Sequence, residues 1–331
     1  MDDVDVSIVV CTFNRAPLLR RALDSLARQQ TQGRFTYEIV VVDNASTDDT
    51  PRVIAAAAQA HAVAIRSVRE TRKGIAIARN RAIQESRGAW IAFHDDDQWA
   101  EPDWLGELMA LAEKKNCLCV GGAVQLELPA TNTRRLSPVC RGLLGEKTKI
   151  TTEFRYNRQT GPGTNNWMIA RTVFDEVGLF DEQLCSSGGE DADLYRRISA
   201  AGYACWYTPR AVVHHIIPEQ RLEDQYMRWT ALRQGGHVAL REFYQWGRWK
   251  MPGIVAARLG QALLIYGPRY LAARVGRDAE KTLGARCLLW RSEGYLRYAL
   301  KYLLPKLCRQ RAFSSAMDFR AGRQGLMEKQ H

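Results

Sequence analysis

Long apolar runs are missing from this chain of 331 residues, which carries a net charge of +11. No stretch reaches the ~18 uninterrupted apolar residues that a membrane-spanning helix needs. The nearest candidate, residues 254–272, is interrupted by Arg258, Gln261, Pro268 and Arg269. The first residues also lack the basic segment and apolar core of a secretory signal. We therefore expect a cytoplasmic protein without a transmembrane helix.

Paired cysteine motifs are absent as well. The eight cysteines include no CxxC pair, and several lie in apolar runs, as Cys11 does after Ile8-Val-Val10. This pattern is typical of small buried side chains in a reducing compartment and argues against a zinc site or a disulfide framework. With 46% hydrophobic and 25% charged residues, the composition is that of a globular protein.

Positive charge is concentrated in the last third of the chain. Residues 236–331 contain 18 Lys and Arg against 6 Asp and Glu, whereas residues 1–235 contain 29 against 30. Such asymmetry indicates an anionic partner. A nucleic acid is disfavoured, because no recognition motif is present and the acidic clusters would repel a phosphate backbone. We predict a catalytic domain over residues 1–235 and a basic, mainly helical region over residues 236–331.

A basic amphipathic helix is predicted near the end of this basic region. Such helices are typical of proteins that bind an anionic membrane surface. A packed helix with a solvated basic face and a docking surface for a partner protein are the alternatives. The apolar face would consist of Leu296, Leu300, Leu303, Leu304 and Leu307, with Arg297, Lys301 and Arg309 off that face and a kink at Pro305.

Strand and helix signals alternate in the first hundred residues. Apolar runs at residues 6–10, 38–42, 63–68 and 90–93 predict strands, with helices between them. Near-continuous apolar strands separated by helices are typical of a parallel sheet covered on both faces, so the fold class is α/β. Residues 121–166 predict irregular loops and antiparallel strands.

Polar and acidic residues follow three of these strands. They are Cys11-Thr-Phe-Asn-Arg15, Asp43-Asn-Ala-Ser-Thr-Asp-Asp49 and His94-Asp-Asp-Asp97. Ligands of such sheets bind beyond the carboxyl ends of the strands, so we expect a site at this edge. Three consecutive carboxylates repel one another unless a cation or solvent relieves them. The run at residues 95–97 predicts Mg²⁺ or Mn²⁺ held against a diphosphate, with a solvated acidic turn as the alternative.

Six motifs, in this order, resemble glycosyltransferase family 2, the inverting nucleotide-sugar-dependent enzymes of the GT-A fold. The resemblance covers residues 5–235 and implies a Rossmann-like, mostly parallel sheet flanked by helices. It implies sugar transfer from a nucleotide-diphosphate sugar to a hydroxyl of a glycan or lipid-linked acceptor, in cell-surface polysaccharide or glycoconjugate synthesis. The matching motifs are Ser7-Ile-Val-Val-Cys-Thr-Phe-Asn-Arg15, Val41-Val-Asp-Asn-Ala-Ser-Thr-Asp-Asp-Thr50, Lys73-Gly74 with Ala78-Arg-Asn80, Phe93-His-Asp-Asp-Asp97, Gly178-Leu-Phe-Asp-Glu182 and Gly189-Glu-Asp-Ala-Asp-Leu194.

The resemblance implies a nucleotide-sugar site built from the first three motifs. Asp43 would accept a hydrogen bond from the base. Thr12, Asn14 and Arg15 would line the nucleotide pocket, and Arg79 would lie near the base or the phosphates. UDP is the preferred nucleotide.

The resemblance also implies a metal site at the Asp-x-Asp motif. The pair is Asp95/Asp97 or, in a shifted alignment, Asp96/Asp97, so Asp97 is the metal ligand in both. Asp95 or Asp96 would contact the ribose or a metal-bound water. His215, in Val212-Val-His-His-Ile-Ile-Pro218, would approach the metal, although a packed histidine pair explains this segment equally well.

The catalytic base implied by the resemblance is Asp191, with Glu190 beside it. On the residues alone, this acidic segment is equally a helix cap. Asn165-Asn-Trp167, after Gly161-Pro-Gly163, resembles an acceptor-side loop in which Trp167 contacts the donor or acceptor sugar, with a buried aromatic as the alternative. Gln225-Tyr-Met-Arg-Trp229 matches a motif of processive synthases, so Arg228 and Trp229 are predicted acceptor contacts, with core packing of Trp229 as the alternative.

Two other functions fit the same residues. One is a polyprenyl-phosphate sugar synthase of the same fold, and the other is a non-catalytic sugar-nucleotide-binding scaffold. For a transferase, the basic region predicts a peripheral location at the inner face of the cytoplasmic membrane.

Overall fold

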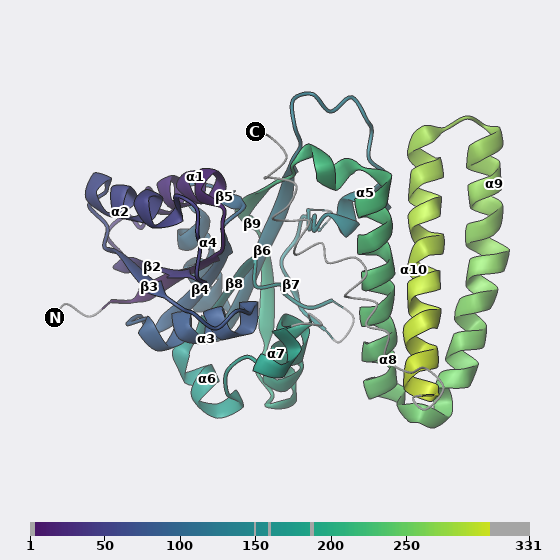
Figure 1. Ribbon diagram of the computed structural model, residues 1–331. Helices are drawn as coiled ribbons and strands as arrows, with labels where there is room; N and C mark the ends of the chain where they lie inside the picture. Colours follow the sequence, from purple (N-terminus) through teal and green to yellow (C-terminus); the bar gives the residue numbers. More distant parts are fainter. Residues whose placement is uncertain (1–3, 149, 158–159, 186–188, 305–331) are drawn as a thin grey trace. The chain divides into compact units, whose positions relative to one another are not determined.

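The computed structural model describes residues 4–148, 150–157, 160–185 and 189–304 (Figure 1). The chain divides into two compact units, Met1–Gln125 with Lys147–Ile216, and Leu126–Glu146 with Ile217–His331. The expected division at residue 235 falls inside helix α8 (Asp224–Gln261), and as a division of function it stays a prediction. In the described ranges, no helix is long and apolar enough to cross a membrane.

The first unit is built on a mixed sheet whose strands run in the order β3-β2-β1-β4-β8-β6-β9-β5. The first four of these strands are parallel, as the alternation of strand and helix signals predicts. Their bounds are β1 (Val6–Thr12), β2 (Tyr37–Asp43), β3 (Ile65–Arg69) and β4 (Trp90–Asp95), and the helices between them are α1 (Ala16–Leu26), α2 (Thr50–Ala60) and α3 (Ile75–Glu85).

The remaining strands are added in antiparallel pairs. β8 runs antiparallel to β4 with Phe93 opposite Trp167, and β6 runs antiparallel to β8. β5 and β7 each pair with β9 in the same sense. The bounds are β5 (Gln98–Ala100), β6 (Cys119–Glu127), β7 (Phe154–Arg155), β8 (Asn166–Ala170) and β9 (Cys205–Ile216), with helices α4 (Trp104–Lys115), α6 (Arg171–Val177), η1 (Glu182–Cys185) and α7 (Glu190–Ala200).

Apolar layers cover both faces of this sheet. Ile8 and Val10 of β1 face a core formed with α1, α2 and α4, whereas Val9 faces a core formed with α3, α6 and α7 (Figure 1). Successive side chains of a strand point to opposite faces, so a run that is apolar throughout fills both cores. The six cysteines described as free thiols are buried apart from Cys11, which is partly buried.

A buried amide joins three elements of this unit. Asn166 Nδ2 donates hydrogen bonds to the carbonyl oxygens of Ala123 and Ala211, at 2.8 and 2.9 Å, and Asn166 Oδ1 accepts one from Trp104 Nε1 at 2.8 Å. Asn166 is 2% exposed, so water cannot replace these bonds. Removing the hydrogen-bond partner of a buried polar group lowers the free energy of unfolding by about 1–3 kcal/mol.

We therefore expect Asn166→Leu to lower the free energy of unfolding by about 3 kcal/mol. The substitution leaves Trp104 Nε1 and the carbonyl oxygens of Ala123 and Ala211 without this partner. Urea unfolding followed by circular dichroism measures this change. Asn132→Leu, at a partly exposed asparagine outside this sheet, is the matched control. An equal effect of the two substitutions would contradict the proposed contribution of the buried amide.

The second unit is helical. It contains α5 (Pro138–Leu143), η2 (Glu219–Leu222), α8, a π-helical turn η3 (Ala262–Tyr266), α9 (Gly267–Val275) and α10 (Ala279–Leu303). The predicted basic amphipathic helix corresponds to the end of α10. Its predicted residues Pro305, Leu307 and Arg309 lie outside the described residues.

Candidate functional site

Three strand ends lie side by side at the carboxyl edge of the parallel strands. In the register of the sheet, Thr12 at the end of β1 is opposite Asp43 at the end of β2. On the other side, Cys11 is opposite Asp95 at the end of β4. The polar residues that follow these strands in sequence are therefore brought to one edge, as the sequence predicts.

Hydrogen bonds join the loop after β1 to the loop after β2 at this edge. The Asn14 amide donates to Ser46 Oγ at 2.9 Å, and Asn14 Oδ1 accepts from the Thr47 amide at 2.7 Å. One carboxylate oxygen of Asp43 accepts from the Ser46 amide at 2.8 Å. Asn14 adopts a φ of 50°, in the left-handed region that asparagine tolerates better than most residues. These contacts fix Asp43 and Asn14 beside each other at the edge predicted to bind a nucleotide.

Arg15 and His215 meet the acidic run from two sides. Arg15 Nη1 lies 2.6 Å from Asp96 Oδ1 and 3.1 Å from Asp97 Oδ2. His215 Nε2 lies 3.6 Å from the same oxygen of Asp97. The strand pairing explains this approach, because Gln98 of β5 is opposite His215 of β9. His215 and Asp97 therefore lie close together, and the approach of His215 to a metal stays a prediction.

Two carboxylates of the acidic run, Asp95 and Asp96, have raised pKa values. Burial, together with the neighbouring charges of Asp97 and Asp96, raises the pKa of Asp95 to about 6, although Arg79 opposes the change. Burial likewise raises the pKa of Asp96, with Arg15 acting in the opposite direction. Asp96 in turn raises the pKa of Arg15. Two arginines therefore do not fully relieve the carboxylates, and an additional cation would be stabilised here.

The predicted ligand set Asp95, Asp97 and His215 is only partly assembled. In the part of the chain that the structure describes, no three His, Cys, Asp or Glu side chains are grouped closely enough to hold a metal ion. Asp95 Oδ1 instead lies 3.7 Å from Arg79 Nη2. Asp95 thus has Arg79 as an ion-pair partner, whereas Asp97 lies beside His215.

Arg79 connects the acidic run to the start of α7. Its Nη1 lies 2.8 Å from Glu190 Oε1, and its Nη2 faces Asp95. Glu190 is 8% exposed and occupied by this ion pair, whereas the next residue, Asp191, is partly exposed. Of the two predicted catalytic carboxylates, Asp191 is therefore the one available to a substrate. Arg79 therefore lies between acidic groups, and its place near the base or the phosphates stays a prediction.

Lys147 is a site residue that the sequence motifs do not indicate. A Cβ atom on Gly163 would lie 3.0 Å from Lys147 Nζ, 2.8 Å from Asn165 Oδ1 and 3.8 Å from Asp191 Oδ2. The three side chains therefore converge on the space that Gly163 leaves open. Burial lowers the pKa of Lys147, and Asp191 opposes this change. No motif could reveal Lys147, because backbone pairing with Val124 brings it there.

The three predicted acceptor contacts lie in different surroundings. Trp167 is 0% exposed and packs in the core with Tyr195, because β8 is a central strand covered on both faces. The buried position of Trp167 therefore favours the alternative of a core aromatic over a sugar contact, and Asn165, two residues earlier, lies beside Gly163. Arg228 and Trp229 belong to α8 in the second unit, where Arg228 Nη2 lies 3.8 Å from Glu293 Oε1. Their acceptor role stays a prediction.

Known proteins that resemble this chain include a polysaccharide biosynthesis protein, a glycosyltransferase and a mannosyltransferase. Succinoglycan biosynthesis protein ExoM of Rhizobium meliloti (strain 1021) is 29% identical over 237 residues, which are 70% of this chain and 72% of that protein. Glycosyltransferase AglE of Haloferax volcanii is 23% identical over 313 residues, which are 89% of this chain and 96% of that protein. The structure of mannosyltransferase PcManGT from Pyrobaculum calidifontis, in complex with GDP-Man and Mn²⁺, matches with a TM-score of 0.60 at 20% identity, covering 92% of this chain and 89% of that one.

The structural match supports the GT-A fold, in which a central α/β sheet is flanked by helices. The family model named Glycosyl transferase family 2 matches residues 7–178, which is more than half of the chain and includes Asp43 and Asp97. Asp191 and His215 lie beyond the matched stretch, on α7 and β9 of the same unit. This chain is a glycosyltransferase and belongs to glycosyl transferase family 2.

Proposed function

We propose that this enzyme transfers a sugar from a nucleotide-diphosphate sugar to a hydroxyl of a glycan or lipid-linked acceptor, with inversion and with a divalent metal ion. The observation that carries the proposal is the approach of His215 and Arg15 to Asp97 at the strand ends. Asp191 directly follows Glu190, which is held in an ion pair with Arg79. The succinoglycan biosynthesis relative supports a role in polysaccharide synthesis.

The nucleotide would bind at the ends of β1 and β2. Asp43 has one carboxylate oxygen on the Ser46 amide, and its other oxygen would accept a hydrogen bond from the base. Thr12 and Asn14 would line the same pocket. The guanidinium of Arg15 would turn from Asp96 and Asp97 toward the diphosphate, since guanidinium groups bind phosphate oxygens well.

The donor chemistry at Asp97 and His215 fits Mn²⁺ or Mg²⁺. A carboxylate oxygen and an imidazole nitrogen 3.6 Å apart can both reach one ion, and Mg²⁺ is commonly held by one or two carboxylates plus substrate phosphates. Asp95 or Asp96 would contact the ribose or a metal-bound water. A bound divalent ion would stabilise the negative charge of the departing diphosphate.

Asp191 would act as the general base in a single displacement. Its carboxylate would accept the proton of the acceptor hydroxyl while that oxygen attacks the anomeric carbon, and the bond to the diphosphate oxygen breaks. Glu190, held by Arg79, would fix the start of α7 and therefore the position of Asp191. One base and one displacement give inversion at the anomeric carbon.

Lys147 would bind an anionic group of the acceptor. We expect Lys147→Met to lower sugar transfer to the acceptor about 10- to 100-fold more than it lowers donor hydrolysis by water, the loss expected for one charge-assisted hydrogen bond. Water has no anionic group for Lys147 to hold. Product release assayed with and without acceptor measures this difference, and Lys114→Met, at an exposed lysine, is the control. Equal losses in the two assays would show that Lys147 does not bind the acceptor.

Calorimetric titration of UDP, GDP, dTDP and CDP, with and without Mn²⁺, tests the proposed donor site. We expect metal-dependent binding of one nucleotide, with UDP preferred, although the complex of PcManGT with GDP-Man makes GDP the main competitor. A folded protein that binds none of them in the presence of metal would contradict the proposal.

Two alternatives give different results in the same preparation. A non-catalytic scaffold would bind a nucleotide sugar but release no nucleoside diphosphate. A polyprenyl-phosphate sugar synthase would transfer sugar to a polyprenyl phosphate directly.

We also propose that the reaction takes place at an anionic membrane surface, peripherally at the inner face of the cytoplasmic membrane. The surplus of positive charge in residues 236–331 supports this location.

A further inference from the structure

The second unit ends in three long helical segments. The second of them along the chain lies at the outer edge of the three in space (Figure 1). Within α8 the chain reverses at Gly247, which has a φ of 70°. The segment that follows, residues 248–275, comprises the end of α8, η3 and α9 and is called the outer helix below. α10 then lies between the first part of α8 and the outer helix (Figure 1).

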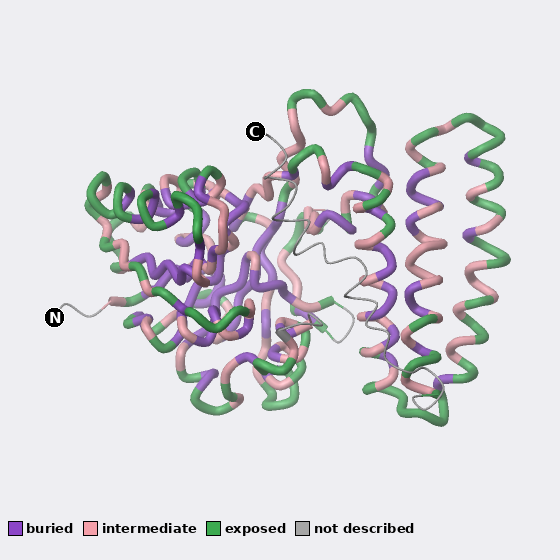
Figure 2. The backbone as a smooth tube through the Cα atoms, in the orientation of Figure 1, coloured by how far each residue is buried: buried purple, intermediate pink, exposed green. Residues whose placement is uncertain are grey.

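Among the described residues of this unit, only one side of the outer helix is packed against other elements. Met251 packs with Tyr295 and Ala299 of α10 in a small core, and Ile254 and Val255 lie against this core. Most other residues of the segment are exposed or partly exposed (Figure 2). A soluble helix in this position normally presents polar residues on its uncovered side.

The uncovered side is instead strongly apolar. Trp249 is 94% exposed, Leu263 73%, Leu264 79%, Leu271 61% and Val275 84%. Leu271 and Val275 are four residues apart in α9 and so share one side of that helix, and Leu263 and Leu264 lie in the π-helical turn before it. Exposed apolar residues gathered in this way mark an interaction surface.

The charges of this segment are all of one sign. Residues 243–277 contain six Lys and Arg and no Asp or Glu. Of these, Arg258 lies against α10 and pairs with Glu242, and the others are exposed. The exposed cations are Arg248, Lys250, Arg269, Arg274 and Arg277.

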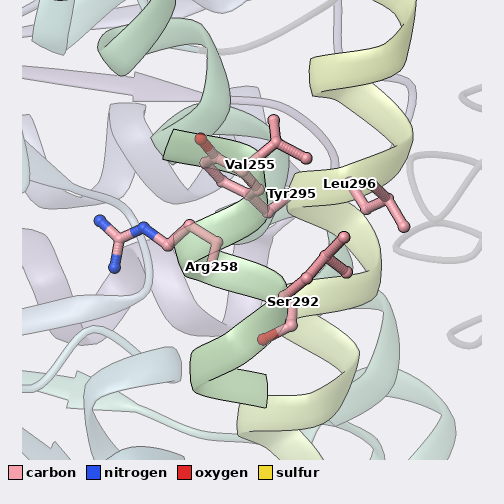
Figure 3. A pocket seen from close by; sticks show the side chains of 6 residues that line it. Val255, Arg258, Ser292, Tyr295 and Leu296 are labelled. Atoms are coloured by element: carbon pink, nitrogen blue, oxygen red, sulfur yellow. The ribbon is translucent and has the colours of Figure 1, made fainter. Parts of the chain in front are cut away.

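The space between the outer helix and α10 does not hold a small ligand. The cavity there, lined by residues that include Val255, Arg258, Tyr295 and Leu296, has a volume of about 10 Å³ (Figure 3). That is at most the size of one water molecule. The apolar residues therefore serve a surface contact.

We propose that the outer helix lies in the headgroup region of an anionic phospholipid bilayer, with Trp249, Leu263, Leu264, Leu271 and Val275 toward the acyl chains. Basic amphipathic helices bind bilayers in this way, because apolar burial and attraction to anionic lipids add together. A nucleic acid would satisfy the cations but leave the apolar side chains in water. This proposal names the residues that would hold the enzyme at the proposed membrane location. It does not depend on the chemistry of the catalytic site.

Sedimentation of the full-length protein with vesicles tests this surface. We expect binding to phosphatidylcholine vesicles with about one third phosphatidylglycerol, and little binding to phosphatidylcholine alone. Arg269→Glu with Arg274→Glu should weaken binding at least about 30-fold, as expected for the loss of two cations at an anionic surface. Arg20→Glu with Arg28→Glu, on the surface of the first unit, changes the net charge equally and should have little effect.

The apolar contribution is tested separately. Leu263→Ser with Leu264→Ser, both at exposed positions, should weaken vesicle binding about 10-fold without a change of charge. In the wild type, Trp249 should shift its emission to shorter wavelength on adding anionic vesicles, and Trp249→Phe should remove most of that shift.

Three results would overturn the proposal. They are no binding of the wild type to anionic vesicles, equal loss in the control variant, and vesicle binding that both outer-helix variants retain. Nucleotide titration of each variant reports separately on the catalytic unit, so a protein that binds vesicles but no nucleotide contradicts the proposed reaction and not the membrane surface.

Discussion

Asp97→Asn is expected to abolish metal-dependent nucleotide binding and to lower sugar transfer by about 1,000-fold or more. Asp97 Oδ2 is the oxygen that both Arg15 and His215 approach, at 3.1 and 3.6 Å. Asparagine preserves the shape of the side chain and removes its charge, so a divalent ion loses its carboxylate ligand. Arg15 retains Asp96 as a partner, so the fold should be preserved.

Two measurements check this expectation. Calorimetry with Mn²⁺ and the preferred nucleotide should show the loss of affinity, and circular dichroism should show an unchanged fold. Asp103→Asn removes an exposed carboxylate six residues further on and should change neither. Retention of metal-dependent affinity by Asp97→Asn would place the metal ligand elsewhere.

Asp191→Asn is expected to lower the rate of transfer about 100- to 10,000-fold while leaving nucleotide affinity unchanged, as general-base removal does. Asp191 is partly exposed at the first turn of α7, whereas its neighbour Glu190 is held by Arg79. Release of nucleoside diphosphate from the donor, with acceptor present, measures the rate. Calorimetry measures the affinity.

The matched control for this substitution is Asp193→Asn. Asp193 lies in the same first turn and pairs with Arg196 and Arg197 of its own helix. Its replacement should reduce helix stability slightly and leave the rate within about threefold, as for an exposed ion pair. If both variants lost activity equally, the effect would come from the helix and not from a base.

The donor side of the site follows from sequence because strand ends determine it. Thr12, Asp43 and Asp95 come directly after apolar runs, and parallel pairing places such ends at one edge. The observed register of the sheet agrees with the sequence pattern. Secondary structure and general sheet geometry are sufficient there.

The acceptor side was less predictable because it depends on long-range antiparallel pairing. Lys147 reaches the site through a backbone bridge with Val124, and Asn165 through the loop before β8. Neither feature has a local pattern. The sequence leaves Trp167 open between a sugar contact and a core position, and only the packing around β8 decides for the core. The ion pair of Asp95 with Arg79 likewise depends on tertiary distances.

The guanidinium of Arg15, shared between two carboxylates, has a consequence for the proposed metal. A divalent ion at Asp97 would compete with this tethered cation for one carboxylate, although the remaining negative charge of the acidic run would favour the ion. A diphosphate that drew Arg15 away would remove this competitor and would bring phosphate oxygens of its own. We therefore expect the metal content of the enzyme in the cell to rise with the supply of activated sugar.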